Sequence, residues 1–95
     1  MAMTVSMCMI TQRPGLEFFL VKVPRGAVTN QFTVDRLANE LRAKVPVDKL
    51  GCDVVFVDAE PSESSLLMGT NPNAVEHIRS LGPRFYRWQD IVIGR

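Results

Sequence analysis

Two segments of the chain are apolar on both of the faces that a strand would present. Alternate side chains of a strand point to opposite faces, yet residues 18–23 and residues 53–58 carry apolar side chains at both odd and even positions. This pattern is typical of strands inside a sheet that is buried on both sides. The chain must therefore cover two faces of a sheet, which limits the folds open to it.

The period of the apolar residues predicts the other strands and helices. Strands are expected at residues 4–10, 18–23, 53–58, 65–68 and 84–93, and helices at residues 33–45 and 72–81. Thr33 is expected to cap the first helix, and Asn71 and Pro72 to begin the second, because these residue types suit a helix N-terminus. The chain has 95 residues, and its lack of a linker or repeat predicts one domain over residues 1–95.

Without its first strand, the predicted order is β-α-β-β-α-β, which resembles the ferredoxin-like split βαβ arrangement over residues 18–93. This resemblance implies an α+β fold, a two-layer sandwich with a mainly antiparallel sheet. Right-handed crossovers in this order place both helices on one face of the sheet. The extra N-terminal strand either displaces the last strand from its usual place or leaves the sheet, and the sequence leaves both alternatives open.

Two helices on one face would leave the other apolar face in water. Large exposed apolar patches usually mark an interface, so we expect a homodimer that packs sheet against sheet through this face. The alternative is that the N-terminal segment, with Met1, Met3, Met7 and Met9, folds over the same face, because methionine adapts to irregular surfaces.

The contact between the helices and the sheet should form the core. The residues expected to be almost fully buried are Leu37, Leu41, Val55, Val57, Val75 and Ile78. Truncation of Leu41 to alanine should therefore lower the stability of the fold considerably.

Residues 83–88 hold the only Tyr and the only Trp of the chain, together with two arginines. The four candidate binding residues in this segment are Arg84, Tyr86, Arg87 and Trp88. Arg, Tyr and Trp are enriched at binding hot spots, and on a strand Arg84, Tyr86 and Trp88 would share one face. We therefore expect these four residues at a ligand or subunit contact. The competing interpretation is an amphipathic strand whose Trp covers the core.

Other groups of reactive residues have simpler explanations. Cys52 and His77 could form an activated thiolate, but a small buried thiol explains Cys52 better. Cys8 and Cys52 are expected to stay reduced and unlinked, because no export signal is visible.

Two predicted loops contain groups that could bind an ion. Asp58, Glu60 and Glu63 could offer oxygen ligands to Mg²⁺, although a polar turn explains them better. The loop at residues 25–30 precedes a helix N-terminus, where anions can bind, but it lacks phosphate-binding fingerprints.

Eleven Lys and Arg residues face ten Asp and Glu residues, so the chain lacks the basic surplus typical of nucleic-acid binding. We expect a small homodimeric binding module that uses no cofactor, with a small molecule or a protein as its partner. The alternatives are a cofactor-free small-molecule enzyme of the dimeric α+β-barrel type and, third, a single-stranded nucleic-acid binder. No apolar run is long enough for a membrane span, and a cytoplasmic location is expected.

Overall fold

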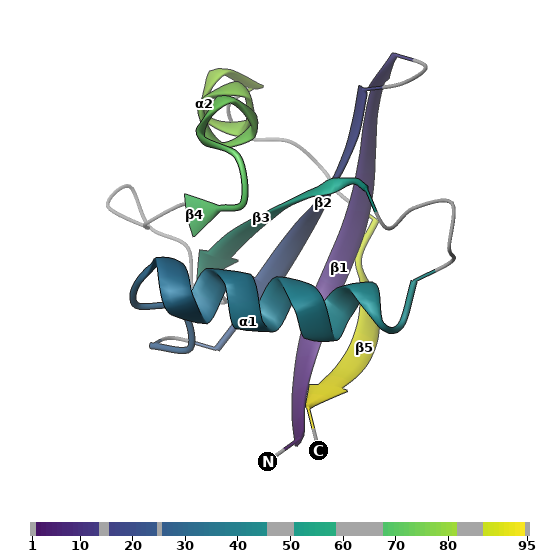
Figure 1. Ribbon diagram of the computed structural model, residues 1–95. Helices are drawn as coiled ribbons and strands as arrows, with labels where there is room; N and C mark the ends of the chain where they lie inside the picture. Colours follow the sequence, from purple (N-terminus) through teal and green to yellow (C-terminus); the bar gives the residue numbers. More distant parts are fainter. Residues whose placement is uncertain are drawn as a thin grey trace.

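The computed structural model describes residues 2–13, 16–24, 26–45, 51–58, 68–81 and 87–94. Its strands are β1 (Ala2–Arg13), β2 (Leu16–Val23), β3 (Asp53–Asp58), β4 (Met68–Gly69) and β5 (Gln89–Gly94), and its helices are α1 (Gln31–Arg42) and α2 (Pro72–Leu81). The predicted order of strands and helices is confirmed (Figure 1). No helix within these residues is long and apolar enough to cross a membrane.

The five strands form one mixed sheet in the order β4-β3-β2-β1-β5. β2 and β3 are parallel, and the other neighbours are antiparallel. The α+β class is confirmed, but the ferredoxin-like strand order is not found, because the strands on either side of α1 are direct neighbours. Of the two alternatives for the N-terminal strand, the first is right: β1 lies beside β2, and β5 lies outside it.

The two helices lie on opposite faces of the sheet, so the expectation of a two-layer sandwich with both helices on one face is wrong. Consecutive residues of β3 show this arrangement, since Val54 packs in a cluster with Leu41 of α1 and Val55 in a separate cluster with Ile78 of α2. Figure 1 shows α1 lying across one face and α2 near β4.

The direction of the strands explains why the crossover rule gave the wrong face. β5 is antiparallel to β1 and so runs parallel to β2 and β3, whereas β4 is antiparallel to β3. The connection through α2 therefore joins two strands that run in opposite directions. The right-handed rule governs crossovers between parallel strands, so it does not constrain α2.

The α1 side of the sheet holds the larger cluster of buried side chains. Its members are Val5, Phe19, Val21, Val23, Val34, Leu37, Ala38, Leu41, Val54, Phe56 and Ile93. The predicted burial of Leu37 and Leu41 is confirmed. Met3 and Met7 lie in β1 and pack against this cluster, so the methionine-rich segment forms a strand of the sheet instead of folding over its second face.

The α2 side holds a second, smaller cluster. Its members are Cys8, Ile10, Phe18, Leu20, Val55, Ala74, Val75 and Ile78. The predicted burial of Val55, Val75 and Ile78 is confirmed, but that of Val57 is wrong, because Val57 is only half-buried. Val57 follows Val55 by two residues on the same face of β3, and its neighbour in β2 is the polar Lys22.

Helix α1 begins earlier than the sequence predicted, with Asn30 as its N-cap. The Asn30 side chain accepts a hydrogen bond from the Thr33 N–H at 3.0 Å, and Thr33 Oγ1 accepts one from the Asn30 N–H at 3.1 Å. This reciprocal pair is a capping box. Thr33 is thus the third residue of the helix and supports the cap from inside.

Helix α2 begins as predicted, with Pro72 first and Asn71 Oδ1 accepting a hydrogen bond from the Asn73 N–H at 2.9 Å. Asn71 Nδ2 also donates to the Asp53 carboxylate at 3.1 Å. Thr70 Oγ1 donates to the same carboxylate at 3.4 Å and accepts from the Val54 N–H at 3.1 Å. These hydrogen bonds connect the residues before α2 with the start of β3.

Gly69 of β4 lies where the backbone and α2 approach closely. A Cβ atom at this position would stand 2.7 Å from the Val54 carbonyl oxygen and 3.1 Å from a Val75 methyl group. Because real side chains do not tolerate such a distance to backbone oxygen, only glycine fits without a shift. The missing side chain lets Val75 pack directly onto the sheet.

Candidate functional site

The structure describes two of the four residues predicted to form a contact site. Arg87 is exposed, and Trp88 is half-buried. Both precede β5, which begins at Gln89, so the predicted strand over residues 84–93 is longer than the strand found among the described residues. Arg84 and Tyr86, and their expected shared face with Trp88, lie outside the described residues.

Trp88 packs against the second face of the sheet, the one that carries α2. Its side chain lies against the smaller cluster, as Val57 does. Lys22 Nζ stands 4.5 Å from the centre of the Trp88 ring, a cation–π geometry. The contact joins β2 to the segment just before β5, across the intervening β1.

Helix α2 covers only part of this second face. Its ten residues span about 15 Å, whereas the twelve residues of β1 extend for about 40 Å. The rest of the face we call the open half-face. It is formed by Thr4, Ser6, Lys22, Val57, Trp88, Asp90 and Val92.

The open half-face contains a row of residues that are in register across four strands. Asp90 pairs with Ser6, Ser6 pairs with Lys22, and Lys22 pairs with Val57. Ser6 Oγ donates a hydrogen bond to Asp90 Oδ1 at 2.9 Å. The row therefore places a carboxylate and an ammonium group on either side of β1.

Apolar and polar side chains alternate over this surface. Thr4 and Asp90 are exposed, and Val92 is 51% exposed. Ser6, Lys22, Val57 and Trp88 are half-buried. Of these residues, only Trp88 is of a type enriched at protein–protein interfaces, and the charged and polar residues are typical of the rim of such interfaces.

Sequence reasoning found Trp88 from its residue type but missed the other members of the open half-face. A signal was present, because Lys22 is the one charged residue in the apolar run 18–23, and Ser6 follows Thr4 as a polar residue on the even-numbered side of residues 4–10. Each polar residue stands on the same face as buried apolar neighbours in its own strand. What brings Lys22, Ser6 and Asp90 together is the strand register, which their spacing in the sequence does not reveal.

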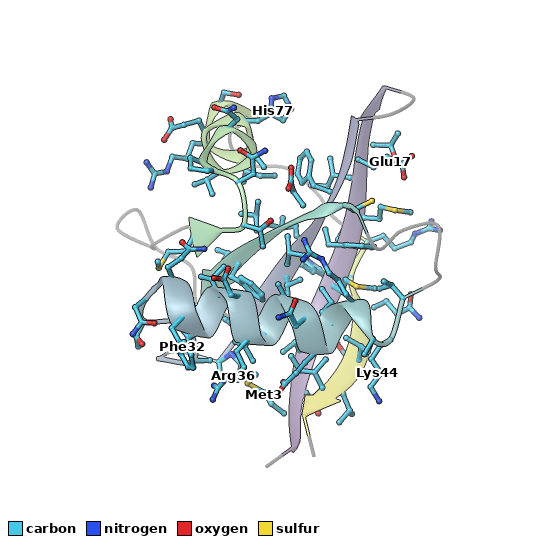
Figure 2. The ribbon with its side chains drawn as sticks, viewed as in Figure 1. Met3, Glu17, Phe32, Arg36, Lys44 and His77 are labelled. Carbon is cyan, nitrogen blue, oxygen red and sulfur yellow. The ribbon has the colours of Figure 1, made fainter. Side chains whose placement is uncertain are left out.

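Cys52 and His77 do not form a catalytic pair. Cys52 packs against the cluster on the α1 side, whereas the His77 ring meets Phe18 of the α2-side cluster edge-on, with ring centres 5.9 Å apart. The sheet thus separates Cys52 from His77, which projects from α2 (Figure 2). Cys8 and Cys52 are free, as predicted.

The described residues give no support to an ion site at either of the two loops, in line with the simpler interpretations preferred above. The side chains of Asp58, Glu60 and Glu63 lie outside the described part of the chain, and within that part no three His, Cys, Asp or Glu side chains gather as metal ligands. At the start of α1, Thr33 Oγ1 accepts hydrogen bonds from the backbone N–H groups of Thr29 and Asn30. The capping residues themselves therefore take up N–H groups that an anion would use.

Comparison with known protein families, with curated proteins and with solved structures finds no match for this chain.

Proposed function

We propose that the protein is a small non-catalytic interaction module that binds a polypeptide through the open half-face. The observation that carries the proposal is the Lys22–Trp88 contact, in which a half-buried aromatic ring and a cation lie at the border of the face that α2 leaves open. Tryptophan is one of the residue types enriched at binding hot spots. We expect Arg87, which is exposed and precedes Trp88 in the chain, at the edge of the contact.

The surroundings of Trp88 favour a polypeptide over the other candidate ligands. The described charged residues of this contact are Lys22, Arg87 and Asp90, so their surplus is a single positive charge, whereas a phosphate backbone is typically bound by several cations. Val92 adds apolar area that a protein partner would cover.

Site-specific crosslinking tests this function. The photoreactive residue benzoylphenylalanine replaces Val92 in one variant and Phe32 in a control variant, and each is irradiated in a cell extract. Phe32 lies on α1, on the other side of the sheet (Figure 2), and at 73% exposure it is more accessible than Val92. We expect the probe at Val92, but not at Phe32, to form a discrete adduct with a polypeptide.

The adduct at Val92 should be lost when Trp88→Ala is added and should weaken when Arg87→Ala is added. Equal adducts at both probe positions, or an adduct that survives Trp88→Ala, would overturn the proposed surface. An adduct that nuclease digestion removes would support single-stranded nucleic-acid binding instead.

A further inference from the structure

We propose that the polypeptide bound by the open half-face is a second copy of this chain, packed face to face about a two-fold axis parallel to β1. This inference rests on the proposed function and names its partner. It differs from the dimer expected from the sequence, because α2 covers part of the face that was expected to be bare.

Lys22 and Asp90 flank Ser6 on opposite sides, in one row of the sheet. Neighbouring strands are about 4.8 Å apart, so the two charged residues are separated by about 10 Å at their backbones, with β1 midway. A surface that binds a copy of itself must be complementary to itself. A positive and a negative group placed evenly about a central strand meet this condition.

The sign of the charges selects the direction of the axis. A two-fold axis parallel to β1 exchanges the side of β2 with the side of β5, so Lys22 of each copy faces Asp90 of the other, and the pair occurs twice. An axis perpendicular to the strands would instead bring Lys22 against Lys22 and Asp90 against Asp90. Like charges that face each other across an interface are unfavourable, so only the first arrangement is complementary.

The position of α2 is compatible with this axis. α2 packs on β3 and β4, at the edge of the sheet opposite β5. The rotation therefore carries the helix of the second copy beyond β5, where it does not meet the first α2. The exposed Val92 and the remaining surface of Trp88 would be covered in the contact. Because the face is small, we expect a weak dimer whose population depends on concentration.

Charge exchange between two variants tests the arrangement. Lys22→Glu alone places two acidic groups against each other twice, and Asp90→Lys alone does the same with basic groups. In an equimolar mixture, however, each copy of one variant meets a copy of the other with both pairs attractive. We expect each variant alone to dimerise at least about tenfold more weakly than the original chain, and the mixture to recover the original affinity.

Sedimentation equilibrium over protein concentrations from micromolar to millimolar measures these affinities. Lys44→Glu and Asp35→Lys serve as matched controls, since both residues are exposed on the α1 side. These two variants should dimerise like the original chain, alone and mixed. Recovery in the mixture also proves that both test variants fold, because unfolded chains would not regain affinity.

Two results would overturn the second-copy proposal. The original chain could sediment with the mass of one chain at every concentration, or the mixture could stay as weak as its components. If either result came with a Trp88-dependent polypeptide adduct at Val92, the proposed function would stand and only the identity of the partner would be wrong. If that adduct were also missing, both proposals would fail.

Discussion

Lys22 and Trp88 lie far apart in the sequence, yet the Lys22 ammonium group stands 4.5 Å from the centre of the indole ring. The contact connects β2 with the segment before β5, across β1, which lies between these two strands in the sheet. It is the one cation–π pair found among the described residues. Such pairs contribute about 0.5–1 kcal/mol at partly exposed sites.

A double-mutant cycle should detect this coupling. Lys22→Met and Trp88→Leu should each lower the free energy of unfolding, and their combined effect should be smaller than the sum by about 0.5–1 kcal/mol. Urea unfolding followed by circular dichroism measures the effects without relying on the removed tryptophan. The same cycle with Lys44→Met should show no coupling, and purely additive effects for Lys22 would argue against the contact.

Replacement of Gly69 by alanine should destabilise the fold by about 1–3 kcal/mol, because the new Cβ atom would meet the Val54 carbonyl oxygen at 2.7 Å. Adding Val75→Ala should not restore stability, since the closest atom belongs to the backbone. Gly51→Ala is the matched control, with nothing within 4 Å of its Cβ position. Equal unfolding free energies for the Gly69 and Gly51 variants would contradict the close approach.

Asn30→Ala should cost about 0.5–2 kcal/mol by removing the N-cap of α1. Thr33→Ala breaks the reciprocal bond from the other side, so the double variant should lose less than the sum of the single variants. Asn39→Ala, at an exposed position inside the same helix, should have little effect. Thermal unfolding measures all four variants, and strict additivity would show that the two caps act independently.

Leu41→Ala should cost about 2–5 kcal/mol, because Leu41 is fully buried between α1 and the sheet. Val57→Ala should cost clearly less, since Val57 belongs to the open half-face and is only half-buried. Chemical denaturation measures both variants under the same conditions. A similar loss of unfolding free energy in the two variants would mean that Val57 is buried more fully than its exposure in the structure indicates.

Much of the secondary structure was predictable because it depends on neighbours along the chain. The alternation of apolar residues located β1, continuous apolar runs located β2 and β3, and the pair Asn71–Pro72 marked the first turn of α2. The N-cap of α1 was placed wrongly because Thr33 and Asn30 belong to one capping box. Either residue type suits a cap, and only the reciprocal bonds reveal which comes first.

The faces of the helices were not predictable from such local patterns. They depend on β4 and β5 running in opposite directions, and those directions follow from pairing with strands elsewhere in the chain. The candidate site shows the same limit. Trp88 stood out by its chemistry, but Ser6 and Lys22 became its neighbours only through register between strands.

The hydrogen bond between Ser6 and Asp90 joins residues separated by 84 positions in the sequence. This large sequence separation has a consequence for the order in which the fold forms. The β1–β2 hairpin can form early, because its strands follow one another in the chain. The outer edge of β1 receives its pairing strand only when residues 89–94 leave the ribosome. Contacts between such distant segments form slowly, and an unpaired strand edge invites pairing with other chains. We therefore expect the docking of β5 to limit the folding rate, and the nascent chain to be prone to aggregation until β5 docks.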